Sequence, residues 1–429
     1  MSWGYVDLTD WIPVDSDVSL AGYDSGYGTT LRMLKSTLVA YTVGGADQQN
    51  AELGIIDLVS KTKTVKYKFS TQLGTSFIRF YDKASGKYKT IGGWGMAGTG
   101  APCGNNGSIY VIDDAGNIDV KCMPYSNTDG NVGICFYDTK TNYIYCGGDT
   151  CGKRIYRLKP DGSYDSDWSA KNMQSVCGTV ILIPATETDL YLVESETFRP
   201  TNPPHSYHAT VDVLDKWKST DYIEDAFTEL TITSSLPVYM VADWAVAVVD
   251  FDYHLIRDGE GWRTDDFETW YTVPLPSLTA VLQGVYLGRL VLLDWDANKI
   301  YICSPGTIYT QATISIPDST LVPGRSFDPP FFISVDTTNR RFKIRALTYN
   351  NMVPMIQYDV NAGKVRVVDI LTGNPVSGFK IKVYYSRFVY PPNIQPMRFP
   401  DFELTPSDYV TLPNPPTADR PVANMWLTL

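Results

Sequence analysis

Short stretches of alternating apolar and polar residues run along the chain, and many of them end at an aspartate that begins a turn. Such aspartates are Asp57, Asp82, Asp113, Asp138, Asp296, Asp336 and Asp359. The carboxylate of each can accept a hydrogen bond from its own turn, and a following Asn or Gly tolerates left-handed backbone. Period-two alternation then buries one face of the returning strand. The pattern predicts antiparallel β-hairpins, and helical periodicity is scarce.

The spacing of these hairpins predicts the architecture. From Asp57 to Asp82, Asp113, Asp138 and Asp161 the steps are 25, 31, 25 and 23 residues. Two hairpins per unit give a repeat of about 50 residues, the size of a four-stranded propeller blade. A β-sandwich also alternates, but it does not need so many strands in one domain. We therefore expect an all-β chain with an N-terminal segment at 1–30 and a β-propeller of six or seven blades at 31–363.

The C-terminal part differs in character. Residues 365–383 resemble the opening hairpin of small immunoglobulin-like modules, although the same stretch also fits a last blade, so 364–390 is expected to be a closing hairpin or a small β-module. Nine of the 27 prolines follow between Pro391 and Pro421, which favours an extended Pro-rich C-terminal arm over 391–429. This arm keeps apolar side chains for docking on its own surface or on a neighbour's: Phe399, Phe402, Tyr409, Trp426 and Leu427.

In architecture the chain resembles the β-propeller superfamily, without the motif of one particular family. Asp10-Trp11, Asp243-Trp244 and Asp294-Trp295 occur as isolated pairs and assemble no WD repeat. The chain also resembles structural proteins of virus and phage particles, because it has few charges, many tyrosines and a proline-rich end. That resemblance implies a virion protein without an enzymatic role.

Charge and composition narrow the partners. The net charge of −11 disfavours phosphate backbones, so nucleic acid is not expected as a partner. The first twenty residues carry four aspartates and no apolar run, which predicts no signal peptide. The most apolar stretch, 238–251, is interrupted by Asp243 and Asp250 and predicts no membrane insertion. A virion location is expected, with extracellular or cytoplasmic locations as alternatives.

Six of the seven cysteines lie between Cys103 and Cys177, without a CxxC pair for zinc. Cys146 and Cys151 flank a turn-like Gly-Gly-Asp-Thr sequence. Across a four-residue hairpin loop they would lie within disulfide reach. The alternative is two reduced cysteines that fill strand positions.

Other groupings suggest metals less strongly. His205 and His208 could share a metal in a tight loop, with His254 or Asp252 as third ligand, but a polar surface loop is the simpler interpretation. The acidic runs at 161–167 and 127–131 lack the spacing of a calcium loop and are typical of turns. We therefore expect no metal and no cofactor.

One acidic and aromatic patch is the best candidate for a glycan site. It combines possible sugar platforms with carboxylates: Trp262, Asp265, Asp266, Glu268 and Trp270. Solvated turns and Arg–carboxylate pairs explain the same residues. No nucleophile elbow, P-loop or Rossmann glycine pattern occurs in the sequence.

These observations favour a non-enzymatic structural or adaptor protein of a viral particle or similar assembly. Its propeller would serve as a rigid binding disc and its arm would dock other structural proteins, either copies of itself or neighbouring subunits. The alternatives are a glycan-binding or glycan-hydrolysing propeller and a protein–protein scaffold inside a cell.

Overall fold

A computed structural model describes the chain over most of its length. The described residues are 2–18, 30–35, 37–44, 51–69, 77–93, 103, 106–126, 132–150, 154–167, 171–172, 178–184, 189–194, 205–210, 228–229, 246–249, 252–257, 260–266, 269–321, 325–326, 331–391 and 394–429. In these ranges the regular elements are β-strands, with no helix. The all-β prediction is confirmed.

The aspartates at strand ends make the turns that the sequence predicts. Asp57 Oδ1 accepts a hydrogen bond from Val59 N at 2.8 Å, and Asp113 Oδ1 accepts one from Ala115 N at 2.9 Å. Where a left-handed backbone is needed, glycine supplies it, as at Gly116 with φ 81°. Each hairpin is therefore specified by local chemistry.

The first two sheets follow the chain in simple order. Each consists of consecutive antiparallel strands: β3 (Thr30–Lys35), β4 (Leu38–Gly44), β5 (Ala51–Asp57) and β6 (Thr62–Phe69), then β7 (Phe77–Asp82), β8 (Lys87–Gly93), β9 (Asn106–Asp113) and β10 (Ile118–Ser126). The short strand β28 (Arg325–Ser326) pairs in parallel with β3.

The next two groups repeat this order, and the pairing of β12 with β15 joins them. Their strands are β11 (Val132–Asp138), β12 (Tyr143–Thr150), β13 (Arg154–Leu158) and β14 (Lys171–Asn172), then β15 (Gly178–Pro184), β16 (Asp189–Glu194), β17 (His205–Thr210) and β18 (Thr228–Glu229).

Two further four-stranded sheets follow. They contain β19 (Val246–Val249), β20 (Asp252–Arg257), β21 (Glu260–Thr264) and β22 (Tyr271–Val273), then β23 (Ala280–Tyr286), β24 (Arg289–Asp294), β25 (Lys299–Cys303) and β26 (Thr310–Ser315). Strand β24 ends at Asp294 rather than near Asp296, because Asp294 Oδ1 accepts the turn hydrogen bond from Ala297 N at 3.0 Å.

The N-terminus completes the last sheet of the ring. Here β27 (Thr320–Leu321), β29 (Phe331–Asp336) and β30 (Arg341–Tyr349) are joined by β1 (Trp3–Asp7), while β2 (Ile12–Pro13) also pairs with β30. Buried Arg345 fixes this closure, with Nε 2.7 Å from Asp7 Oδ1 and Nη2 2.6 Å from Asp318 Oδ2. Strands β1 and β2 of the expected N-terminal segment 1–30 therefore pair with β30 of the propeller.

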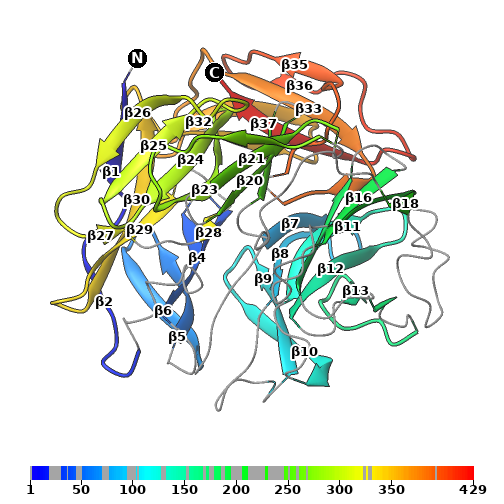
Figure 1. Cartoon of the computed structure of the whole chain (residues 1–429), viewed down its shortest axis with the longest axis horizontal. Helices are drawn as coiled ribbons and strands as arrows, with labels where there is room; N and C mark the ends of the chain where they lie inside the picture. The colour runs from blue at the N-terminus through cyan, green and yellow to red at the C-terminus, as the bar shows by residue number, and fades with distance from the viewer. Residues whose placement is uncertain are drawn as a thin grey trace.

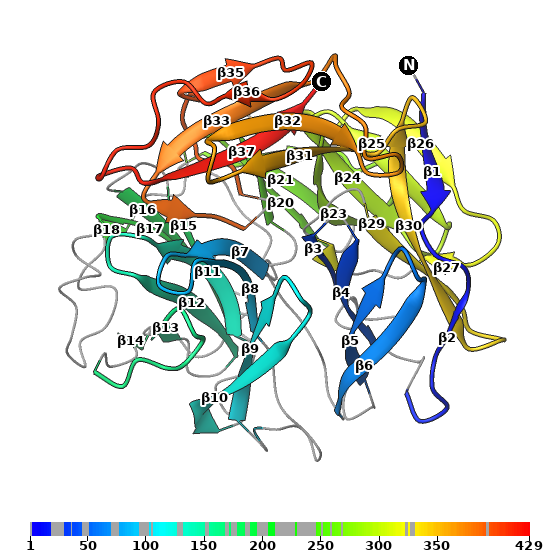
Figure 2. The same ribbon diagram turned by 180° about the vertical axis from the view of Figure 1, so that it is seen from behind.

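Successive sheets pack face to face, which makes the fold a β-propeller (Figures 1 and 2). One buried cluster joins Ile55 of the first sheet to Tyr110 of the second, and another joins Ile91 to Tyr156 of the third. The last sheet packs on the first, since Phe342 and Val39 share a cluster. The propeller prediction is confirmed, and the number of blades stays a prediction.

A two-sheet module stands on one face of the propeller, drawn in orange and red in Figure 2. One sheet contains β31 (Pro354–Asp359), β32 (Lys364–Asp369) and β36 (Val410–Thr411), and the other contains β35 (Phe402–Leu404), β33 (Lys380–Ser386) and β37 (Val422–Thr428). We call these six strands the C-terminal module. The boundaries expected at 363 and 390 do not coincide with its pairings, because β31 pairs with β32 and the proline-rich segment supplies β35, β36 and β37.

Two contacts fix the module to the propeller in cis. Strand β34 (Phe388–Val389) pairs with β11, and Arg387 forms a buried two-pronged ion pair with Asp138. The distances are 2.9 Å from Nε to Oδ1 and 2.6 Å from Nη2 to Oδ2. One buried cluster also joins Ile381 of the module to Leu347 of the last propeller sheet. The expected arm therefore packs largely on its own molecule.

For Cys146, the structure fits the alternative of a reduced cysteine in a strand better than a Cys146–Cys151 disulfide. Strand β12 continues from Tyr143 to Thr150, so the expected hairpin loop after Cys146 is extended strand. Cys146 is buried outside any disulfide, with Sγ 3.7 Å from the Tyr156 carbonyl oxygen. Cys151 lies outside the described residues. Among the described residues, a disulfide joins Cys103 to Cys122.

Candidate functional site

The acidic and aromatic patch predicted for glycans forms a hairpin and its turn. Trp270 is only 3% exposed, so its ring belongs to the core and cannot serve as a sugar platform. Asp266 accepts hydrogen bonds from the turn, 2.7 Å from Thr269 N and 3.0 Å from Thr264 Oγ1. Trp262 is half-buried and Asp265 is exposed, while Glu268 lies outside the described residues. Of the predicted site, the described residues leave two exposed acids, Asp265 and Asp266, and one half-buried ring, Trp262.

The structure also places the histidines that the sequence suggested as metal ligands. His205 and His208 lie in strand β17 rather than in the expected tight loop. His254 is buried, and its Nε2 accepts a hydrogen bond from Gly306 N at 3.3 Å. Burial, with the nearby charge of Arg263, lowers the pKa of His254 to about 4. In the described part of the chain no group of His, Cys, Asp and Glu is arranged to hold a metal ion.

The aspartates of the acidic run at 161–167 stabilise a turn and a neighbouring strand. Asp161 Oδ1 accepts hydrogen bonds from Ser163 N at 3.0 Å and Ser163 Oγ at 2.6 Å. Asp165 is buried and binds Arg157 Nε at 2.7 Å. The second run, 127–131, lies outside the described residues.

The predicted docking residues divide into two groups. Phe399 is 81% exposed and Tyr409 is 40% exposed, with the Arg366 guanidinium 4.2 Å from the Tyr409 ring. Phe402 and Leu427 pack against the buried cluster shared by the module and the propeller. Trp426 packs edge-on against Tyr384 with ring centroids 5.2 Å apart. Phe399 and Tyr409 are therefore the most exposed of the five predicted docking residues.

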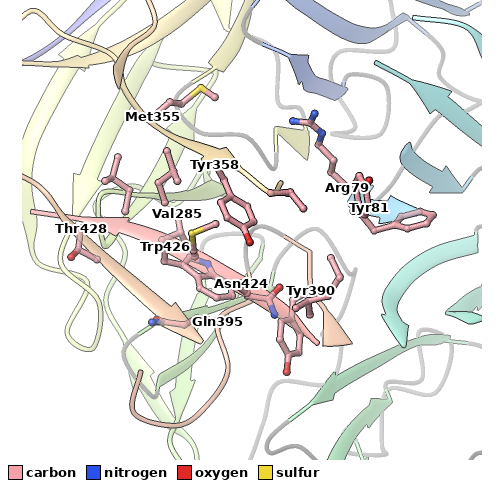
Figure 3. Close-up of a pocket in the computed structure, with 18 of the residues that line it drawn as sticks. Arg79, Tyr81, Val285, Met355, Tyr358, Tyr390, Gln395, Asn424, Trp426 and Thr428 are labelled. Atoms are coloured by element: carbon pink, nitrogen blue, oxygen red, sulfur yellow. The ribbon is translucent and has the colours of Figure 1, made fainter. Parts of the chain in front are cut away.

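A large cleft lies between the propeller and the C-terminal module (Figure 3). Its volume is about 550 Å³, within the range of pockets that bind small ligands or peptide side chains. Its lining comes from the β7–β8 hairpin, the end of β19 at Val249, the β23–β24 turn, strands β31 and β37 with the residues next to them, and Val389, Tyr390 and Gln395 in and after β34. We call it the interface cleft.

Aromatic side chains reach the interface cleft from both the propeller and the C-terminal module. Tyr358 extends from β31, and Trp426 lies on β37 opposite it (Figure 3). From the propeller, Tyr81 and Tyr88 form a cross-strand pair with ring centroids 5.3 Å apart. Burial raises the pKa of Tyr88 to about 12 and also raises the pKa of Tyr358. Both phenols are therefore neutral near pH 7 and offer hydrogen bonds without charge.

The charged groups of the interface cleft are cations. Arg79 donates from Nη2 to both Asp114 carboxylate oxygens at 3.0 Å, and its guanidinium carbon lies 4.5 Å from the centre of the Tyr88 ring. Arg79 Nε is buried without a hydrogen-bond partner. Lys83, in the β7–β8 turn, is exposed. Among the described lining residues there is no Asp, Glu, His or Cys.

Acid–base and nucleophilic catalysis depend on groups that the described lining does not contain. Paired carboxylates or an activated nucleophile would be needed for glycoside or acyl hydrolysis. A neutral phenol with a raised pKa is a poor general base near neutral pH. The described cleft instead offers aromatic surface, neutral hydrogen-bonding groups and positive charge.

Of the residues that line the cleft, Trp426 and Leu427 were predicted from the sequence as docking residues. Tyr81 and Tyr88 carried a weak signal, because they flank a predicted hairpin symmetrically. Nothing in the sequence placed β31 and β37 opposite that hairpin.

The comparisons with known proteins show a distant likeness. No protein-family model and no curated protein matches the chain. Solved structures similar to it include virginiamycin B lyase from Staphylococcus aureus, at 12% identity and a TM-score of 0.48, covering 81% of this chain and 100% of that one. The WD40 β-propeller domain of Doa1 is similar at 13% identity and a TM-score of 0.45, covering 80% and 97%. Likenesses at this level carry no argument about activity.

In the described ranges no helical segment has the length and apolar character to cross a bilayer.

Proposed function

We propose that this chain is a non-enzymatic structural or adaptor protein of a larger assembly, and specifically of a viral particle. The observation that carries the proposal is the interface cleft, which is large, aromatic and, in its described lining, without a carboxylate, imidazole or thiol. A site of this composition binds a partner and has no evident means to transform it.

The fold supports a rigid binding disc. Ring closure by β1 and the buried Arg345 pairs hold the propeller together. The buried Arg387–Asp138 pair and the shared core hold the module on the propeller. A partner would therefore meet a preorganised surface, which lowers the entropic cost of binding.

The module also presents apolar side chains to neighbours. Phe399 and Tyr409 are exposed on a segment whose backbone is held by strand pairing nearby. Exposed aromatic residues are enriched where proteins meet other proteins. Docking of copies of this chain or of neighbouring subunits through these two residues is part of the proposal.

The test is incorporation into particles. The full chain and a Phe399→Asp/Tyr409→Asp variant would be produced in the source of the chain, and particles would be separated by density-gradient sedimentation and identified by mass spectrometry. The wild type should co-sediment with particles, and the variant should remain in the light fractions. Point variants are preferable to removal of residues 391–429, because that segment supplies strands to the folded module.

The control is a Leu278→Asp/Tyr309→Asp variant. These side chains are 81% and 71% exposed but lie outside the C-terminal module. The variant should incorporate normally. A wild-type chain absent from particles would refute the assembly role, and equal incorporation of all three proteins would refute docking through Phe399 and Tyr409.

A glycan-binding or glycan-hydrolysing role, the alternative from the sequence, gains no second aromatic platform from the structure, because Trp270 is buried. A scaffold inside a cell would use the same surfaces and would differ in where the chain is found. The mass spectrometry of particles separates that case from the proposed one.

A further inference from the structure

Two strand edges of the C-terminal module face the interface cleft. Strand β37 pairs with β33 on one side only, and β31 pairs with β32 on one side only. Every residue of β37 lines the cleft, as do Pro354, Ile356 and Tyr358 of β31. The described part of the chain places no further strand on either edge.

An open strand edge is a template for another strand. Alternate residues of β37 direct backbone N–H and C=O groups away from β33, and within the described residues no other backbone hydrogen bond engages these groups. Proteins blunt such edges or use them to bind an extended peptide by strand addition. Strand β37 has seven residues, about 23 Å of edge at about 3.3 Å per residue.

The side chains around the edge define what the added strand would carry. Tyr358 lies on one side of the cleft, and Tyr81 and Tyr88 lie on the propeller side. Aromatic surface of this kind accommodates β-branched or aromatic side chains that alternate along an extended peptide. A small rigid ligand would fill the volume but would leave the strand edges unused.

Charge selects among such peptides. Arg79 and Lys83 are the only charged residues in the described lining, although the whole chain carries a net charge of −11. Lys83 is exposed and forms no ion pair in the described part of the chain, whereas the charge of Arg79 is balanced by Asp114. A carboxylate on the peptide would therefore find positive charge at the β7–β8 end of the cleft.

We propose that the interface cleft binds an extended acidic segment of a partner protein as an added β-strand along β37. The inference rests on the proposed adaptor function and names the class of its partner. Recognition comes from three sources: backbone hydrogen bonds to the open edge of β37, apolar contacts with the tyrosines, and attraction of a carboxylate to Lys83.

The test uses synthetic peptides and the full-length protein. An array of octapeptides in which each position is scanned with every amino-acid type identifies a binder, which is then measured by fluorescence polarisation. Binders should alternate apolar residues and carry an Asp or Glu. Methylation of alternate peptide amides should weaken the binder at least tenfold, because several backbone hydrogen bonds are lost.

Matched variants in one hairpin test the charge. Lys83 and Lys87 are both exposed in the β7–β8 hairpin, but only Lys83 lines the cleft. Lys83→Glu should weaken the binder about fivefold at low salt, and less at high salt. Lys87→Glu makes the same change in net charge and should leave the affinity unchanged.

Each other result overturns the inference. Absence of any binder, equal binding of the methylated peptide, or equal effects of the two lysine variants would refute strand addition with charge selection. Failure of the proposed adaptor function has a different outcome, because the chain would then be absent from particles whether or not a peptide binds. Normal incorporation without a peptide binder would refute this inference alone.

Discussion

Truncation of Arg387 should loosen the C-terminal module from the propeller. In Arg387→Ala the Asp138 carboxylate stays buried without its guanidinium partner. The carboxylate keeps hydrogen bonds from Lys140 N at 3.0 Å and Thr141 Oγ1 at 2.9 Å. These remaining donors offset part of the loss, so the cost should fall near the lower end of the range for a broken buried pair, about 3 kcal/mol.

Hydrogen exchange measured by mass spectrometry tests this prediction locally. A loss of about 3 kcal/mol corresponds to roughly a hundredfold faster exchange where opening of the docked strands controls the rate. The acceleration should appear in β34 and in β11, which pair at Tyr137 with Val389. The urea midpoint of unfolding should also fall.

The control is Arg366→Ala, the same substitution at an exposed pair of the same module. Arg366 Nη1 lies 3.5 Å from Asp408 Oδ1, and the Asp408 side chain is 69% exposed. Pairs of this kind contribute about 0–1 kcal/mol. The reasoning is refuted if Arg387→Ala costs no more than Arg366→Ala, or if its faster exchange spreads evenly over all sheets.

Three further predictions follow from single features. The pKa of His254 is about 4 in the folded protein against 6.5 for a free histidine, so on acidification the unfolded chain binds a proton at a higher pH than the folded protein does. The free energy of unfolding should therefore have its full value above about pH 6.5 and fall by about 3 kcal/mol towards pH 4. Urea unfolding over this pH range should show that His254→Gln loses less stability than the wild type as the pH falls. Parallel pH profiles of the two proteins would contradict the lowered pKa of His254. Replacement of Cys103 and Cys122 by serine should lower the free energy of unfolding by about 3 kcal/mol; alkylation of both thiols in the unreduced protein would contradict the bridge. A glycan array and hydrolysis assay should show neither binding nor turnover, whereas turnover abolished by Asp265→Asn and Glu268→Gln would establish the enzyme instead.

The sequence by itself determined the hairpins and, through their spacing, the propeller. The physical reason is that each hairpin is local, since Asp57 or Asp113 caps a turn within four residues and alternation then sets the buried face. The sequence placed one turn at Asp296, whereas the strand ends at Asp294. Two aspartates two residues apart give equal local signals for a turn, and the packing of the strand selects Asp294.

The tertiary structure alone decided how the ring closes, how the module docks and where the cleft forms. The Arg345–Asp7 contact joins residues 338 apart in sequence, and the Arg387–Asp138 contact joins residues 249 apart. No local pattern encodes such pairs, because an arginine and an aspartate become partners only when burial excludes water and brings them together. The same holds for the interface cleft, whose tyrosines come from strands that meet only after the module packs on the propeller.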